Sequence, residues 1–149
     1  MAASYEILSE WNLKYVFISS SIELDELRSL ADRYFDDPRF DRSIRFLVDL
    51  TELTASSARF RDVFTLYSYY RRKLHGLDRP IDVAIVAPGD FAFGMSHMFF
   101  ALANMDHVMH IKIFADMAGA AEWLVVPVEV ATHLHVEQYA LLGAIPQDT

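Results

Sequence analysis

The chain has 149 residues, with 13 Lys and Arg against 21 Asp and Glu, which gives a net charge of −8 when His is neutral. Hydrophobic residues make up 53% and aromatic residues 13%, which excludes a disordered chain, and the length fits one domain with a sizeable core. The absence of cysteine excludes disulfides, zinc–thiolate sites, iron–sulfur clusters and a Cys nucleophile.

The acidic charge is concentrated in the second half of the chain. Residues 80–149 carry Lys112 against eight acidic residues. Nucleic-acid binding needs a basic surface, so we expect no nucleic-acid partner. The longest uncharged stretch, Phe91–Met105, is too short and too polar to span a bilayer. The first residues show no basic region followed by an apolar run, so we expect no signal peptide and a cytoplasmic location.

The first half of the chain predicts a hairpin, a helix and a buried strand. Two β-rich runs separated by a short connection are typical of an antiparallel hairpin, and a Ser and a Glu three residues apart are typical of a capping box. The predicted features are strands Tyr5–Ser9 and Lys14–Ser20, a capping box at Ser20 and Glu23, a helix whose apolar face runs from Leu24 to Phe35, and strand Ile44–Leu50.

The next elements alternate between helix and strand, and glycine, proline and aspartate mark several of their ends. The predicted features are a helix from Ser56 or Ser57 to about His75 that stops at Gly76, strand Ile81–Ala87, a helix capped by Asp90 that runs to about Asn104, strand Met109–Phe114, and helix Met117–Leu124 capped by Asp116.

The resulting order, β-β-α-β-α-β-α-β-α, predicts a single-domain α/β fold with a mixed, mostly parallel sheet and flanking helices. We expect this domain to span residues 1–126, with a C-terminal extension over 127–149. The extension alternates apolar and polar residues as a strand would. Pro127 and Gly143 stand where helices begin and end, which favours a helix.

Several short motifs recur in the order seen in a known family. They are Val48-Asp49-Leu50-Thr51, Val86-Ala87, Phe93-Gly94-Met95 with Met98-Phe99, Ile113-Phe114-Ala115-Asp116 and Ala120-Ala121-Glu122-Trp123-Leu124. Over about residues 5–124, the chain thereby resembles a bacterial family of small, mostly uncharacterised proteins with the fold of anti-sigma-factor antagonists, called STAS-like or SpoIIAA-like. The motifs are mostly structural, so the resemblance implies a fold more than a function.

The resemblance also implies a candidate phosphorylation loop at Ser56 and Ser57. Anti-sigma-factor antagonists carry a phosphorylated serine in an Asp-Ser-Ser-Gly-type loop. Here Ala55 stands in place of the acid and Ala58 in place of the glycine. A serine at a helix start is commonly an N-cap, so these serines are either caps or a phosphosite.

An unusual stretch, Phe91–Phe100, follows a predicted strand and carries a glycine within the first turn of a helix. A glycine there suggests close approach by another backbone or by a ligand, and ligands collect at the carboxyl ends of parallel strands. The stretch is either core or the lining of an apolar pocket or interface. The candidate ligand or partner surface consists of Phe91, Phe93, Gly94, Met95, His97 and Met98.

We assign no catalytic, cofactor-binding or metal-binding residue. Ser96 and His97 are adjacent, and adjacent helical residues do not face each other. A small enzyme would therefore need a site assembled by folding from these two residues and the Asp49–Ser57 loop. If the tail is helical, Glu129, His133 and Glu137 lie on one helix face, but no second cluster completes a metal site.

We therefore predict a non-enzymatic binding or regulatory module that contacts a protein partner or a small apolar ligand. The alternatives are the small enzyme described above and a lipid carrier, which requires a cavity of several hundred cubic ångströms. The apolar tail adds surface beyond the predicted domain, so we also expect a homodimer. In the other interpretation of the tail, this surface covers its own chain.

Overall fold

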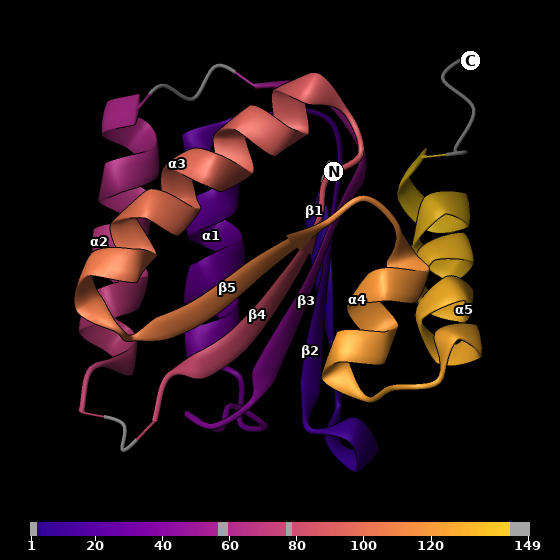
Figure 1. The fold of residues 1–149 in the computed structure, drawn as a ribbon, viewed down its shortest axis with the longest axis horizontal. Coiled ribbons are helices and arrows are strands. Elements are labelled where there is room, and N and C mark those ends of the chain that lie inside the picture. Colours follow the sequence, from indigo (N-terminus) through magenta and orange to yellow (C-terminus); the bar gives the residue numbers. More distant parts are fainter. Residues whose placement is uncertain (1–2, 57–59, 77–78, 144–149) are drawn as a thin grey trace.

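The computed structural model describes residues 3–56, 60–76 and 79–143, which form a five-stranded sheet with helices on both faces (Figure 1). The strands are β1 (Ala3–Leu8), β2 (Leu13–Ile22), β3 (Arg45–Ser56), β4 (Ile81–Val86) and β5 (Met109–Phe114). The helices are α1 (Leu24–Phe35), α2 (Phe60–Leu74), α3 (Asp90–Asp106), α4 (Met117–Leu124) and α5 (Val128–Gln138), with a 3-10 turn at Ser9–Trp11 and a π-helical turn at Tyr139–Gly143.

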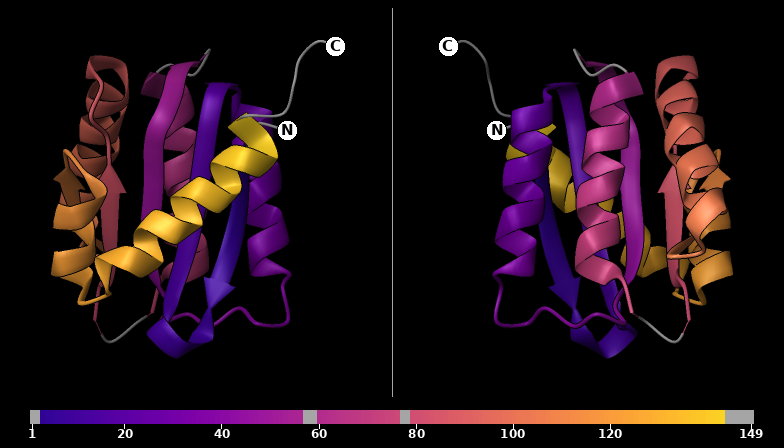
Figure 2. Two further views of the ribbon diagram at one scale, coloured as in Figure 1. Left: turned by 90° about the vertical axis from the view of Figure 1, so that its right-hand side faces the viewer. Right: turned by 90° about the vertical axis from the view of Figure 1, so that its left-hand side faces the viewer.

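The order of the strands in the sheet follows their order in the chain. β1 pairs antiparallel with β2, as the hairpin prediction requires, and the later neighbours are parallel. Right-handed crossovers that always step in the same direction place their helices on one face. Accordingly α1, α2 and α3 lie side by side on one face, and α4 and α5 cover the other (Figure 2). The predicted α/β class, with its mixed and mostly parallel sheet, is confirmed.

The sheet separates two hydrophobic cores. Successive residues of a strand point to opposite faces, so Val16 and Ile18 of β2 pack toward α1–α3. Tyr15 and Phe17 of the same strand pack toward α4 and α5. This alternation decides which core, and therefore which candidate site, each strand residue can join.

The predicted capping box at Ser20 and Glu23 is wrong by three residues. β2 continues through Ser20 to Ile22, and the N-cap of α1 is Glu23. The capping box instead pairs Glu23 with Glu26, whose side chain accepts the Glu23 backbone N–H at 3.4 Å. The strand extends because β2 keeps its parallel pairing with β3 as far as Ile22, opposite Ser56.

The predicted helix start at Ser56 is also wrong, because β3 runs through this residue and the described part of α2 begins at Phe60. Ser57, the other predicted start, lies outside the described residues. Asp90 is the first residue of α3 rather than its cap, and Gly89 takes the N-cap position. The predicted stop at Gly76 is confirmed by its φ of +90°.

The tail forms the predicted helix, α5, which crosses the open face of the sheet (Figure 2). Pro127 is its N-cap rather than its first helical residue. Ala131 and Leu134 are buried in the core with Phe17, whereas Val136 is 57% exposed. Part of the apolar surface of the tail is thus buried against its own chain.

Candidate functional site

A cavity of about 150 Å³ lies between the sheet and helices α1, α2 and α3. Its floor consists of alternate residues of the central strands, including Val16 and Ile18 of β2 and Val48 and Leu50 of β3. The helical wall includes Leu27 and Leu30 of α1, Val63 and Leu66 of α2, and Met95 and Phe99 of α3. Most of the lining is aliphatic or aromatic, so water in the cavity would find few hydrogen-bond partners.

Lys14 lies at one end of this cavity. It precedes Val16 by two positions on β2 and therefore points to the same face of the sheet. Its side chain is 0% exposed, and no atom of the described chain forms a hydrogen bond with its Nζ. Burial lowers the pKa of the Lys14 amine to about 7, because an ammonium in an apolar environment loses its hydration.

Four aromatic rings from four different elements surround the Lys14 amine. Its Nζ lies 3.7 Å from the ring centroid of Tyr34, 4.4 Å from that of Phe46 and 5.5 Å from that of Tyr70. The Tyr5 ring is 5.9 Å away. Ring faces attract a cation through their quadrupole, but they supply no oxygen that could accept the N–H bonds. We call these four rings the aromatic cage.

Tyr34 stands at the centre of the aromatic cage. Its ring packs edge-on against Tyr5 at 5.7 Å and against Phe46 at 5.8 Å between centroids. Burial raises the pKa of the Tyr34 phenol, so the hydroxyl keeps its proton at neutral pH. The Tyr34 Oη is the second buried side-chain polar atom of the described residues that has no hydrogen-bond partner. The Lys14 Nζ is the other, so both atoms belong to residues of the aromatic cage and its enclosed amine.

The opposite end of the cavity is acidic. Asp62, in the first turn of α2, belongs to the cavity lining. Tyr70 lies eight residues further along α2, and a rise of about 1.5 Å per residue separates the two backbone positions by roughly 12 Å. The cavity thus has a basic end, an apolar middle and an acidic end.

The structure divides the candidate surface of α3 between two sides of the helix. Met95 and the neighbouring Ser96 line the cavity. Phe91 and Phe93 are 38% and 48% exposed, and because they are two positions apart on the helix they point to different flanks of it. His97 is exposed and its ring packs at a tilt against Phe93, with 4.4 Å between ring centroids. Met98 is half-buried and does not line the cavity. The six predicted residues therefore do not form one site.

Gly94 is exposed, and the expectation of close packing at this position is wrong. A Cβ atom added to Gly94 would meet nothing within 4 Å. The glycine is therefore not required by a neighbouring backbone in the described structure. Its position on the outer side of α3 removes it from the cavity as well.

The geometry does not assemble the small enzyme considered above. The Ser96 hydroxyl donates a 2.7 Å hydrogen bond to the carbonyl of Ala92, one turn earlier in α3. Asp49 faces α5 on the other side of the sheet, so the sheet lies between Asp49 and Ser96. The Asp49–Ser57 segment is described up to Ser56, and this part is strand rather than loop.

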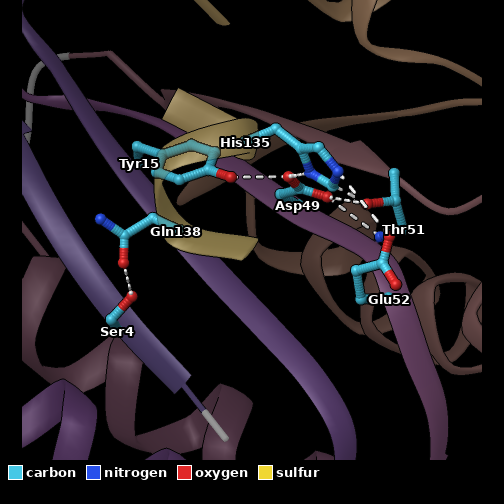
Figure 3. A network of polar contacts seen from close by, with 7 residues as sticks. All are labelled: Ser4, Tyr15, Asp49, Thr51, Glu52, His135 and Gln138. Carbon is cyan, nitrogen blue, oxygen red and sulfur yellow. Dashed lines mark hydrogen bonds and ion pairs between the residues drawn. The ribbon is translucent and has the colours of Figure 1, made fainter. Parts of the chain in front are cut away.

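A polar cluster, defined as Tyr15, Asp49, Thr51 and His135, connects α5 to the sheet (Figure 3). The Asp49 carboxylate is fully buried. It accepts a 2.6 Å bond from the Tyr15 hydroxyl and lies 2.7 Å from Nδ1 of His135. The Thr51 backbone N–H and hydroxyl both donate to the other carboxylate oxygen, at 3.0 and 2.6 Å. Burial, and then the Asp49 charge, raise the pKa of the Tyr15 phenol.

The polar cluster explains why α5 packs where it does. Four contacts satisfy a buried charge that would otherwise be costly, and one of them comes from α5. Its His135 is 23% exposed at the side chain, and its Nε2 lies 3.7 Å from the Glu52 carboxylate. A second bond, from the Ser4 hydroxyl to Gln138, joins the end of α5 to β1 (Figure 3).

The described residues contain no group of three or more His, Cys, Asp or Glu side chains placed to hold a metal ion. The predicted face of Glu129, His133 and Glu137 is solvent-exposed on α5. Across the same residues, no helix combines the length and the apolar character needed to cross a membrane.

Sequence reasoning missed Lys14 and His135 as members of sites, and it named Asp49 only as the start of the loop in the alternative enzyme site. Lys14 did carry a signal, because it is the one charged residue in the apolar run Leu13–Ser19. A charge in a buried strand needs an explanation. The partners of Lys14 and Asp49 lie 20 or more positions away in most cases, so local patterns could not identify them.

The chain is similar to a solved structure, that of an uncharacterised protein from the DUF3478 family of Shewanella loihica PV-4 with a SpoIIAA-like fold. The two are 19% identical, with a TM-score of 0.54, over 83% of this chain and 94% of the other. This likeness confirms the SpoIIAA-like fold that the sequence motifs implied. No protein-family model and no curated protein matches the chain.

Proposed function

We propose that this protein is a non-enzymatic binding module that holds a small apolar ligand in the cavity between the sheet and α1–α3. The observation that carries the proposal is the size of this cavity within a folded core. Protein interiors contain few voids larger than a water molecule. The cavity is partly open to solvent, and an apolar ligand that fills it would remove its apolar lining from water, which is favourable.

The volume sets the size of the ligand. A cavity of about 150 Å³ lined by apolar side chains has room for a molecule the size of benzene. A lipid carrier requires several hundred cubic ångströms, more than the 150 Å³ present here. The ligand we propose is therefore a single ring or a short alkyl chain.

Methyl NMR on isoleucine-labelled protein tests this proposal with toluene as the probe. Ile18 and Ile85 line the cavity, whereas Ile44 and Ile81 belong to the same core but do not line it. We expect toluene to shift the methyl resonances of the first pair and to leave those of the second pair in place. Equal shifts in both pairs, or none in either, would overturn the proposal.

Matched valine variants add a control. Val63→Phe places a ring in the cavity, and Val136→Phe makes the same change on the exposed side of α5. Toluene binding should be lost in Val63→Phe and retained in Val136→Phe. If Val63→Phe bound toluene as the parent protein does, the ligand would lie elsewhere.

A protein partner on the outer side of α3 is a second candidate function. Phe93 is 48% exposed there beside His97, and Phe91 is 38% exposed on another flank of the helix. Aromatic residues are common at the centres of interfaces. In such a module, ligand in the cavity could regulate the partner through Met95 and Ser96 on the inner side of α3. Replacing both phenylalanines by serine should abolish partner capture and leave toluene binding unchanged.

Self-association as a homodimer and a cytoplasmic location remain proposals as well. The dimer draws support from the apolar residues that α5 leaves exposed, such as Val128 and Val136. Part of the tail is buried against its own sheet, so any dimer would have to use the outer side of α5.

A further inference from the structure

Lys14 is a buried amine whose hydrogen-bonding capacity is unused. A protonated lysine has three N–H donors and no acceptor. No atom of the described chain accepts a bond from Nζ, and the side chain is 0% exposed, which leaves no contact with bulk water. A buried donor without an acceptor destabilises the fold in which it sits. Lys14 is one of the residues that line the apolar cavity.

We infer that the ligand of this cavity is a small apolar carboxylate whose carboxylate group binds the Lys14 amine while its apolar body fills the cavity. This inference rests on the proposed function, because it assumes that the cavity holds an apolar molecule. It adds the chemical class of that molecule and the residue that recognises it.

A carboxylate supplies the hydrogen-bond acceptors that the Lys14 amine lacks. Its oxygens accept the N–H bonds that the ring faces of Tyr34 and Phe46 do not, and charge-assisted bonds of this kind are about twice as strong as neutral ones. The carboxylate also carries one negative charge, opposite to that of Lys14, which is the one basic residue among the described residues of the lining. A phosphate monoester would bring a charge close to −2 and leave part of it unpaired in an apolar site.

The distribution of charge in the cavity also sets the orientation of the ligand. Asp62 lies at the end opposite to the Lys14 cage, roughly 12 Å along α2 from Tyr70. The positive charge of the lining lies at Lys14, so the ligand carboxylate lies there and the apolar end points toward the end of the cavity that holds Asp62.

Calorimetric titration with benzoate and with benzyl alcohol tests this inference, because the two probes share a ring and an oxygen acceptor but differ in charge. The variants are Lys14→Met, which removes the amine from the cavity, and Lys112→Met, which makes the same change at an exposed lysine of β5. We expect the parent protein and Lys112→Met to bind benzoate at least tenfold more tightly than benzyl alcohol. Lys14→Met should lose this preference while it still binds benzyl alcohol.

The outcomes separate the inference from the proposed function. Binding of benzyl alcohol with no preference for benzoate would overturn the inference and leave the proposed function intact. An equal preference in Lys14→Met would also overturn it. If neither benzoate, benzyl alcohol nor toluene bound, the proposed function itself would fail.

A second measurement covers the case in which Lys14→Met does not fold. The chain has three lysines, Lys14, Lys73 and Lys112, so protein labelled with ¹³C at the lysine Cε gives three resonances. Benzoate should shift the Lys14 resonance alone, and benzyl alcohol should shift it much less. If benzoate moved the resonance of Lys73 or Lys112 and left that of Lys14 in place, the inference would be wrong.

Discussion

Replacing Lys14 by Met should stabilise the protein near neutral pH, and the gain should shrink as the pH rises. Burial lowers the pKa of the Lys14 amine from 10.5 to about 7. Between these values the unfolded chain binds a proton that the folded chain does not, so the free energy of unfolding increases with pH. From pH 7 to pH 9 these two pKa values correspond to about 2 kcal/mol at this one group. Methionine has a similar length and does not titrate, so the Lys14→Met protein lacks this contribution to the pH dependence of the free energy of unfolding.

The groups that face the amine do not titrate in the same window. They are Tyr5 of β1, Tyr34 of α1, Phe46 of β3 and Tyr70 of α2. Burial raises the pKa of each of these tyrosines above the ordinary value of 10, for Tyr5 to about 12. The attraction between the ammonium and the rings opposes the effect of burial, which makes about 2 kcal/mol an upper value.

Urea unfolding of both proteins at pH 7 and at pH 9 measures this effect. At pH 7 Lys14→Met should be the more stable protein. The difference between the two proteins should fall by up to about 2 kcal/mol at pH 9. The contributions of all other titratable groups cancel in this difference, because both proteins contain those groups. A difference that is equal at the two pH values would show that the amine is not desolvated in the folded protein, and the reasoning on Lys14 would be refuted.

Three further predictions concern other parts of the molecule. Gly94→Ala should raise the free energy of unfolding by about 1 kcal/mol, because an added Cβ meets nothing within 4 Å; a loss of stability would mean that α3 packs differently. Asp49→Ala should lower the free energy of unfolding in urea by about 3 kcal/mol, because the Tyr15 hydroxyl then lacks its acceptor. Ser4→Ala removes one hydrogen bond to α5 and should lower it by about 1 kcal/mol. Equal losses in the two variants would contradict the role of the polar cluster. The full chain should sediment as a dimer at tens of micromolar and become monomeric or aggregate when truncated after Val126, and a monomeric full chain would refute the dimer.

The fold was predictable where local pattern and global packing agree. The apolar run Ile81–Val86 is buried on both faces of the sheet, and it was predicted from this composition alone. Errors occurred at element ends such as Ser20 and Ser56, where the pairing of β2 with β3 extends both strands past residues that favour helix starts. Tertiary pairing there overrides the local capping preference.

The candidate site was less predictable because distant residues build it. The amine of Lys14 meets rings that the chain supplies at positions 5, 34, 46 and 70. Gly94 shows the opposite case. Its residue type suggested a close approach, but exposure depends on the side of α3 on which it falls, and the local apolar pattern is too continuous to indicate this side.

Native mass spectrometry of the purified protein tests most directly whether the cavity holds a small ligand. We expect the parent protein and Val136→Phe to carry one bound molecule, with a mass in the range of a single ring or a short chain, and Val63→Phe to carry none. A ligand-free mass for the parent protein after gentle purification, or the same bound mass in Val63→Phe, would contradict the account.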